Sequence, residues 1–300
     1  MTTKISILFE KIESSLIYKT TEANQEIQLT YKKEYFESIV IEETGQNIDV
    51  SGSGVLTYVF PEIGEHAVLI KFKPEITDFT VCFGLCSNLQ SIPENLFWNN
   101  PEATNFDECF GGCSNLQLIP ENLFINNPKV TNFANCLARC SNLQLIPEKL
   151  FWNNLLVTNF RGCFASCSNI QLIPEKLFWN NPEVTDFSNC FGGCSNLQLI
   201  PENLFANNLK VITFNGCFYN CSSLQSIPEN LFVNNLKVTS FSSCFWNCKA
   251  IIGTTPKDSD GGELWQRVDK EGFPTSISGN YCFRNCSKLD NYADIPTSWK

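Results

Sequence analysis

The chain has 300 residues, 43% of them hydrophobic, which is enough to bury a sizeable core, so we expect a folded protein. Its 31 acidic and 21 basic side chains give a net charge of −10, and this charge disfavours nucleic acid and anionic membrane surfaces as partners. A single histidine, His66, leaves the chain almost without the commonest general base and metal ligand, which disfavours most hydrolase and oxidoreductase designs.

The N-terminal apolar runs are short and are interrupted by Glu10, Lys11 and Glu13, so we predict no secretory signal peptide there. No segment of the chain reaches the roughly 18 apolar residues that a membrane-spanning helix needs. We therefore expect no membrane insertion.

Four runs rich in β-branched and aromatic residues come next, separated by turns that contain Gly or Asn. They lie at residues 27–31, 38–43, 55–60 and 67–72. This pattern predicts a small antiparallel all-β domain over residues 1–73 that also covers the first unit of the C-terminal region. His66 has no partner motif, and we interpret it as a turn or surface residue rather than a catalyst.

From residue 74 onward the chain is an internal repeat. Its 16 cysteines form eight pairs with a spacing of four, and the first seven pairs recur every 27 residues. The pairs are 82/86, 109/113, 136/140, 163/167, 190/194, 217/221, 244/248 and 282/286. Six complete units lie between Cys82 and Ser243 and share twelve identical columns. Such a period indicates a repeat architecture in which each unit buries its apolar face against its neighbours.

Each unit is predicted to contain two extended pieces and two short helices. In the second unit, residues 116–119 are extended and end at Pro120, which favours the first position of a short helix. Residues 130–133, Val-Thr-Asn-Phe, favour a second strand. The apolar residues at 133, 136, 137 and 140 then follow helical spacing, which places both cysteines on one face of a helix.

The C-terminal end departs from the repeat. The seventh unit carries 11 extra residues before Cys282, and their Gly, Pro and Asp content predicts an inserted loop at about residues 251–275. The last unit regains Ile295 and Pro296 and ends with Trp299, so residues 282–300 are expected to form a C-terminal cap.

The cysteines are interpreted as buried structural thiols. Cβ atoms at i and i+4 of a helix are about 5–6 Å apart, whereas a disulfide needs about 3.8 Å. A zinc site would require adjacent units to bring four thiolates together without help from histidine. Disulfides and zinc are kept as alternatives, but we expect no cofactor and no metal, since free cysteine behaves as a small buried hydrophobe.

Other identical columns also have structural interpretations. A glutamate column is explained by the electrostatics of helix starts rather than by a cation ladder. Glutamine and paired-asparagine columns are expected to form side-chain hydrogen bonds from unit to unit. The glutamates are Glu94, Glu121, Glu148, Glu175, Glu202 and Glu229.

No motif carries recognisable catalytic chemistry. The sequence has no nucleophile elbow, phosphate loop or HExxH helix. Carboxylates at variable positions do not form an identifiable acid pair, and we expect no enzyme. These carboxylates are Asp107, Glu108, Asp258, Asp260 and Glu263.

One variable column is the candidate contact surface. The position after the recurrent Leu-Phe holds Trp98, Ile125, Trp152, Trp179, Ala206 and Val233. A tightly packed core site would not accept Trp and Ala interchangeably, so this column is predicted to lie at or near the surface. Trp98, Trp152 and Trp179 are the candidate contact residues, because aromatic anchors favour protein and glycan binding. The alternative is that each Trp packs over the neighbouring unit.

The repeat resembles that of the BspA-type leucine-rich repeat surface proteins. The resemblance rests on Val-Thr-Asn-Phe at 130–133, Cys-Phe-x-x-Cys-Ser-Asn-Leu at 109–116 and the Ile-Pro after it, and it covers residues 74–300. It implies an α/β repeat, a leucine-rich-repeat-like solenoid of about eight coils behind the small N-terminal all-β domain. It also implies a cell-surface or secreted protein that acts in adhesion and protein binding.

These features predict a non-enzymatic, adhesion-type interaction protein that presents an extended surface to a protein or glycan ligand. The alternative is a structural spacer or appendage subunit of a larger assembly such as a phage virion, with the N-terminal domain as its attachment module. The sequence leaves the ligand, the compartment and the oligomeric state open.

Overall fold

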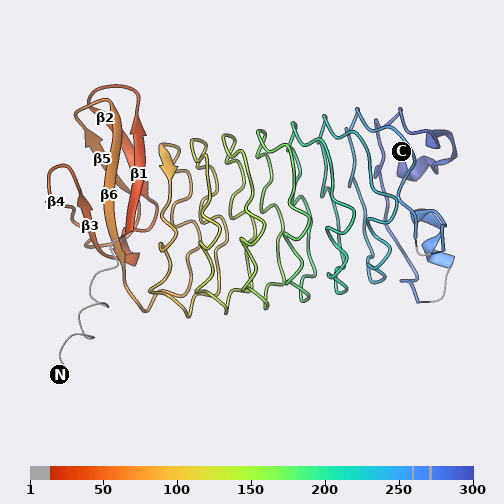
Figure 1. The fold of residues 1–300 in the computed structure, drawn as a ribbon, viewed down its shortest axis with the longest axis horizontal. Coiled ribbons are helices and arrows are strands. Elements are labelled where there is room, and N and C mark those ends of the chain that lie inside the picture. Colours follow the sequence, from red (N-terminus) through yellow and green to blue (C-terminus); the bar gives the residue numbers. More distant parts are fainter. Residues whose placement is uncertain (1–13, 259, 270–271) are drawn as a thin grey trace, which may run out of the picture.

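The computed structural model describes residues 14–258, 260–269 and 272–300. Antiparallel sheets lie at the N-terminal end, and the repeats form an elongated row of stacked units beside them (Figure 1). The N-terminal segment 1–13, for which no signal peptide is predicted, lies outside the described residues.

The N-terminal region contains two antiparallel sheets. The larger sheet has the strand order β4-β3-β6-β1-β7, and the smaller sheet pairs β2 with β5. The larger sheet comprises β1 (Ser14–Thr20), β3 (Phe36–Ile41), β4 (Gln46–Asn47), β6 (Gly64–Phe72) and β7 (Leu89–Ser91). The smaller comprises β2 (Gln25–Thr30) and β5 (Leu56–Phe60).

The four runs predicted as strands coincide with β2, β3, β5 and β6, so these predictions are confirmed. β1 was not predicted, since its apolar run covers only residues 16–18 and is flanked by polar residues on both sides. It lies between β6 and β7. Because β7 belongs to the first repeat, the larger sheet joins the N-terminal region to the repeats.

The repeats contain no α-helix among the described residues and, apart from β7, no strand longer than a single bridge. The helices present are short 3-10 helices outside the six complete repeats: η1 (Lys33–Tyr35), η2 (Leu264–Asp269), η3 (Tyr292–Asp294) and η4 (Thr297–Trp299). The prediction of an α/β leucine-rich-repeat-like solenoid is therefore wrong. None of the described helices is of a length and apolarity that would allow it to cross a bilayer.

Turns take the place of the predicted helices because each cysteine is preceded by a residue with a positive φ. This left-handed conformation interrupts a right-handed helix and is adopted readily only by Gly and, less often, Asn. Successive backbone amides then alternate between two kinds of acceptor. Cys82 N donates to Phe79 O within its own turn, while Phe83 N donates to Cys109 O of the next repeat. The left-handed residues are Val81, Leu85, Glu108, Gly112, Asn135, Arg139, Gly162, Ser166, Asn189, Gly193, Gly216, Asn220, Ser243, Asn247, Tyr281 and Asn285.

The Val-Thr-x-Phe pieces form a row of single parallel bridges rather than a strand ladder. Asn105 bridges Asn132, for example, and Thr131 N donates to Thr104 O at 2.9 Å. The bridging residues are Asp78, Asn105, Asn132, Asn159, Asp186, Thr213, Ser240 and Ser278. Consecutive repeats therefore lie in parallel register, and equivalent residues are neighbours along the stack.

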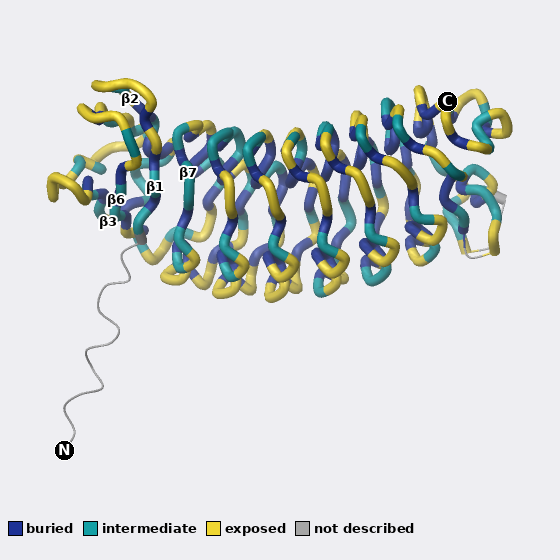
Figure 2. Tube along the Cα trace, turned by 45° about the horizontal axis from the view of Figure 1, so that its top comes forward, coloured by how far each residue is buried: buried dark blue, intermediate teal, exposed yellow. Residues whose placement is uncertain are grey.

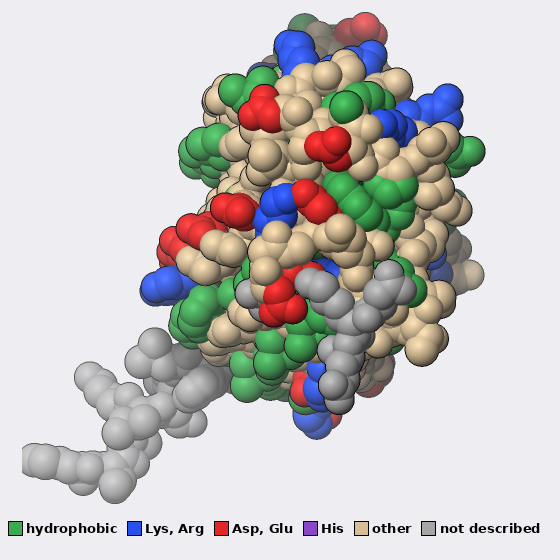
Figure 3. Space-filling view, turned by 90° about the vertical axis from the view of Figure 1, so that its right-hand side faces the viewer, with side chains coloured by type: hydrophobic (Ala, Val, Ile, Leu, Met, Phe, Trp, Pro, Cys, Tyr) green, Lys and Arg blue, Asp and Glu red, His purple; other side chains and the backbone are tan. Residues whose placement is uncertain are grey.

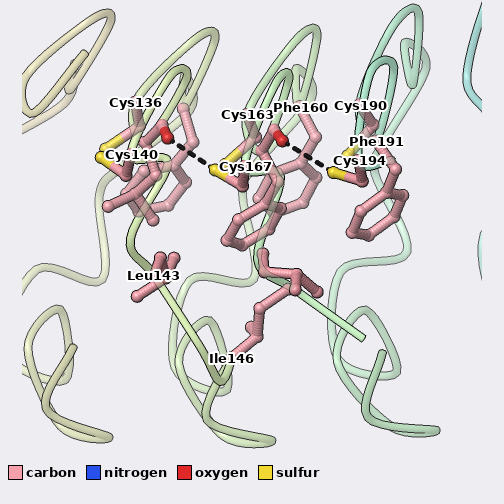
Figure 4. Packing of buried hydrophobic residues seen from close by; sticks show 14 of the residues in the cluster. Cys136, Cys140, Leu143, Ile146, Phe160, Cys163, Cys167, Cys190, Phe191 and Cys194 are labelled. Carbon is pink, nitrogen blue, oxygen red and sulfur yellow. Dashed lines mark hydrogen bonds between the residues drawn. The ribbon is translucent and has the colours of Figure 1, made fainter. Parts of the chain in front are cut away.

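Stacked phenylalanines form the core of the repeats. Phe133 and Phe160, for example, are parallel to within 5° with ring centroids 5.8 Å apart. Buried residues line the inside of the stack and exposed residues cover its outside (Figure 2). The Phe side chains and the cysteines pack together between consecutive repeats (Figure 4). Each repeat therefore buries its apolar side chains against the next, as the repeat period predicted.

Both ends of the stack are covered by other segments. At the N-terminal end, Tyr31 N donates to Cys82 O at 2.9 Å and Gln28 Nε2 donates to Gly84 O at 2.7 Å. At the C-terminal end, Phe283 N donates to Trp299 O at 2.8 Å, and the Trp299 side chain is buried. The inserted residues leave the stack intact, since Phe245 and Phe283 on either side of them are stacked at 5.7 Å.

Candidate binding surfaces

All sixteen cysteines are free and buried, which confirms the interpretation as buried thiols. From Cys113 onward, the second cysteine of each repeat donates its thiol hydrogen to a backbone carbonyl of the preceding repeat, whereas Cys86 accepts a bond from Gln28 Nε2. Cys167 Sγ lies 3.1 Å from Leu137 O, and Cys194 Sγ lies 3.1 Å from Phe164 O (Figure 4). Burial raises the thiol pKa, for Cys140 and Cys194 to about 12, so the thiols stay protonated at neutral pH and act as donors. These thiols join repeats and do not face a ligand.

The second asparagine of each Asn-Asn pair forms a buried ladder. Asn127 Nδ2 donates to Asn100 O at 2.9 Å and to Phe97 O at 3.1 Å, and the later asparagines repeat this pattern. The buried Oδ1 atoms of the ladder have no hydrogen-bond partner in the described part of the chain. The ladder comprises Asn100, Asn127, Asn154, Asn181, Asn208 and Asn235. Side-chain bonds between repeats were predicted here, but their acceptors are backbone carbonyls.

Arg267 takes the place of the next asparagine at the end of this ladder. Its Nη2 lies 2.8 Å from Phe232 O and its Nη1 lies 3.5 Å from Asn235 O. Burial lowers the Arg267 pKa to about 10. The guanidinium also lies 5.7 Å from the ring centroid of Phe241. No sequence pattern indicates this role, because Arg267 lies in the insertion, outside the repeat register.

The glutamate and glutamine columns differ from their predicted roles. There is no helix start to stabilise in the described repeats, and glutamates of this column accept bonds from the next repeat, as Glu175 does from Asn203 Nδ2 at 2.9 Å. The repeat glutamines are joined through their backbones: Gln198 N donates to Gln171 O at 3.0 Å. Both columns therefore link repeats.

His66 lies within β6 and is 7% exposed, so its placement in a turn or at the surface was wrong. Its Nε2 is 3.0 Å from Thr20 Oγ1 and its Nδ1 is 3.4 Å from Glu43 Oε1, an order of groups that resembles a catalytic triad. Thr20 is fully buried, however, and its hydroxyl also donates to Glu62 O at 2.9 Å. The cluster therefore fastens β1 to the turn before β6.

The predicted tryptophan column lies at the surface. Trp98, Trp152 and Trp179 are 39%, 36% and 39% exposed, while the phenylalanine before each of them is fully buried. The carbonyl oxygen of Trp152 accepts a bond from Asn180 Nδ2 of the next repeat at 3.2 Å. The backbone of the column is therefore bonded to the next repeat, while the tryptophan rings are partly exposed to solvent. That the three tryptophans contact a ligand stays a prediction.

A second exposed column was missed. Four leucines on consecutive repeats, which we call the leucine stripe, are 47–63% exposed: Leu118, Leu145, Leu172 and Leu199. Leu172 and Leu199 form a parallel bridge, so the column is continuous along the stack. In a regular strand, alternate residues face the same side, so Leu118 would be buried together with Leu116. In the structure Leu116 and Ile119 are buried instead, and the two residues between them are exposed. The occurrence of Ser91 and Ser226 in the same column was the available signal.

A third surface lies near the C-terminal end, on the row of cysteine turns. We call it the aromatic hollow. It measures about 380 Å³ and is lined by Asn189, Asn215, Gly216, Tyr219, Ser242, Ser243 and Trp246. The Tyr219 and Trp246 rings are nearly perpendicular at 5.5 Å, and Tyr281 lies 5.8 Å beyond Trp246. Arg284 lies over both Trp246 and Tyr281.

The charged groups do not converge on a reactive centre. Glu263 pairs with Lys257 in the insertion, and Asp258 Oδ1 accepts the Gly262 amide at 2.8 Å. Partial burial raises the pKa of Asp107, which receives a bond from Asn135. Among the described residues, no three His, Cys, Asp or Glu side chains form a group that could hold a metal ion. Seen from the C-terminal end, acidic, basic and apolar side chains are interspersed (Figure 3).

The repeats match one known protein family. Residues 77–203 and 131–255 each match the family model described as Mycoplasma protein of unknown function, DUF285, and together they span more than half of the chain. This is a repeat family related to the BspA-like proteins, whereas membership of the BspA-type leucine-rich repeat family itself is not confirmed. No curated protein matches the chain.

Proposed function

The chain belongs to the DUF285 family, and from that premise we propose that it is a non-enzymatic interaction protein whose repeat stack presents its side to a protein or glycan partner. The observation that carries this proposal is the leucine stripe. Exposed leucines on four consecutive repeats form a continuous apolar strip, and such strips mark interaction sites on soluble proteins.

The distribution of polar groups supports the same proposal. The cysteine thiols and the ladder asparagines are buried and bonded to the neighbouring repeat, so they are unavailable for chemistry on a substrate. Variation between repeats falls on the outside, as in the tryptophan column and the leucine stripe. A fixed interior with a variable outside is typical of repeat proteins that bind partners along their length.

A spacer role is the second candidate. It is favoured by the uninterrupted stacking of phenylalanines, since Phe187 and Phe214 are parallel within 3° at 5.8 Å and Phe218 and Phe245 within 8° at 5.5 Å. A stack joined by identical contacts at each step resists bending, and a spacer needs that property. It gives no reason for the leucine stripe.

Variants of the exposed columns distinguish the two candidates. The double variant Leu145→Glu/Leu172→Glu places charge on the stripe, while Leu209→Glu does so at a leucine that is 54% exposed elsewhere. Binding of the purified protein to immobilised cell-surface protein and polysaccharide fractions is measured by surface plasmon resonance. We expect the stripe variant to bind at least about tenfold more weakly than wild type and Leu209→Glu to bind as wild type. Binding to neither fraction by wild type, or equal binding by all three proteins, would contradict the proposal and favour the spacer.

A further inference from the structure

The aromatic hollow combines ring faces with unpartnered polar groups. Tyr219 is 37% exposed and Tyr281 is 46% exposed, and the perpendicular rings of Tyr219 and Trp246 form two sides of a corner. The side-chain amide of Asn189 and the hydroxyl of Ser243 line the same space, and neither has a hydrogen-bond partner within the described chain. Aromatic faces and a few amide or hydroxyl groups in one small cavity are the usual recognition elements for a compact polar ligand.

A sugar ring fits these elements. It presents a face of C–H groups, which packs on an aromatic ring, and a rim of hydroxyl groups, which both donate and accept hydrogen bonds. An amide side chain such as Asn189 also donates and accepts, so it can bond two neighbouring hydroxyls. The volume of about 380 Å³ lies within the range of small-molecule sites.

We propose that the aromatic hollow binds one sugar unit of an uncharged glycan, which names the ligand class within the proposed interaction function and rests on it. The ring of the sugar packs on Trp246 and Tyr219, while Asn189 and Ser243 bond its hydroxyls. The Arg284 guanidinium lies 5.3 Å from the centroid of the Trp246 ring and 5.0 Å from that of the Tyr281 ring. These contacts hold Trp246 and Tyr281 in place at the edge of the hollow.

The uncharged class follows from the lining and from the protein's charge. None of the seven residues that line the hollow carries a charge. The chain as a whole has a net charge of −10, which disfavours an acidic polysaccharide at long range. Arg284 is engaged with the two rings.

The site is confined to one end of the stack. The column that holds Tyr219 and Trp246 is filled by small residues in all earlier repeats: Gly84, Gly111, Ala138, Ala165 and Gly192. A second hollow of about 340 Å³ lies on the same row near the N-terminal end, and Gly84, Gly111 and Ala138 contribute to its lining. Aromatic residues enter this column only where the hollow with unpartnered polar groups lies.

The same column supplies a variant that should fold. Because earlier repeats have Gly or Ala at this position, Tyr219→Ala/Trp246→Ala introduces residues that the turn already accepts. A second variant, Asn189→Gly, removes the amide without removing a ring, since Gly already occupies this left-handed column at 162 and 216. The matched control is Leu209→Ala/Leu236→Ala, which removes two side chains that are 54% and 41% exposed from another column.

Binding is measured by isothermal titration calorimetry with hexasaccharides of glucose, mannose and N-acetylglucosamine, and with hexagalacturonate as the acidic probe. We expect wild type and the Leu209/Leu236 control to bind at least one neutral hexasaccharide in preference to hexagalacturonate. Both hollow variants should bind it at least about tenfold more weakly, with thermal midpoints within about 3 °C of wild type.

Three results would overturn the assignment. These are no binding of any neutral hexasaccharide by wild type, preference for hexagalacturonate, or hollow variants that bind as wild type does. Loss of binding in the Leu209/Leu236 control alone would refute the hollow while leaving the proposed interaction function in place. Absence of glycan binding together with loss of surface-protein binding in the leucine-stripe variant would do the same.

Discussion

The N-terminal sheets and the repeat stack both bury apolar side chains, but they satisfy their backbones differently. β1 pairs with β6 over seven consecutive residues, so main-chain bonds alone fix their register. Neighbouring repeats are joined by scattered backbone bonds, such as Phe133 N to Asn159 O at 3.0 Å, and side chains supply further bonds, such as Asn154 Nδ2 to Asn127 O at 2.9 Å. In the sheets the backbone holds the fold together, whereas in the stack particular side chains share this task.

Alkaline pH should give the largest difference in stability between the two regions, because every cysteine lies in the repeats and none lies in the N-terminal region. Burial raises thiol pKa values from about 9 in the unfolded chain to about 12 for Cys86, Cys140, Cys194 and Cys286. Above pH 9 the unfolded state loses thiol protons that the folded state keeps, so stability is full below pH 9 and is lost between pH 9 and about 12. Each thiol contributes a slope of about 1.4 kcal/mol per pH unit.

We therefore expect the stack to unfold cooperatively between pH 9 and 11, as measured by circular dichroism and urea denaturation. A double variant, Cys140→Ala/Cys194→Ala, should lower the pH slope by about two protons. Stability that stays constant up to pH 11 would show that the thiols are not buried as described.

The asparagine ladder provides the next largest effect. Asn154→Asp replaces a donor that serves Phe124 O and Asn127 O with a buried carboxylate that faces two carbonyl oxygens. We expect a loss of about 3–5 kcal/mol in the free energy of unfolding. The neighbouring Asn153 is exposed and makes a single bond, to Ile125 O, so Asn153→Asp should cost less than about 1 kcal/mol. Equal losses in urea denaturation would mean that the buried ladder does not carry the contact between repeats.

Left-handed turn residues give the smallest effect, and here a substitution should stabilise. Val81 has a φ of 58°, which is unfavourable for a β-branched side chain, while the same column accepts Asn at 135 and 189. Val81→Asn is expected to raise the free energy of unfolding by about 1 kcal/mol. Glu75→Asn, at a nearby exposed residue that lacks a positive φ, should change stability by less than about 0.5 kcal/mol. A lower thermal midpoint for Val81→Asn than for wild type would show that the backbone conformation of Val81 is not strained.

The period, the buried phenylalanines and cysteines, and four of the strands could be predicted because each depends on a repeated or alternating pattern of apolar residues. The helices were predicted wrongly, since the spacing of residues 133, 136, 137 and 140 fits a helix as well as consecutive turns. The residues before the cysteines were the overlooked signal, because nine of those sixteen residues are Gly or Asn.

The surfaces were harder to predict than the interior. The tryptophan column was found because Trp and Ala interchange within it, and the same reasoning applied to Leu118 and Ser91 would have found the leucine stripe. It would also have found the aromatic hollow, because Tyr219 and Trp246 stand in a column that holds Gly or Ala in earlier repeats. Only Tyr281 lies outside the 27-residue register: it follows the insertion, and three-dimensional stacking brings it beside Trp246.

The asparagine ladder has a direction: each amide donates toward the N-terminus, beginning at Lys73 O and ending with the Arg267 guanidinium. An internal repeat meets the same partners on both sides, while the two ends are specialised. Whole 27-residue units can therefore be gained or lost by gene duplication or deletion without changing either end. Length is thus the property of this architecture that evolution can alter most freely, and the exposed columns along the stack lengthen or shorten with it.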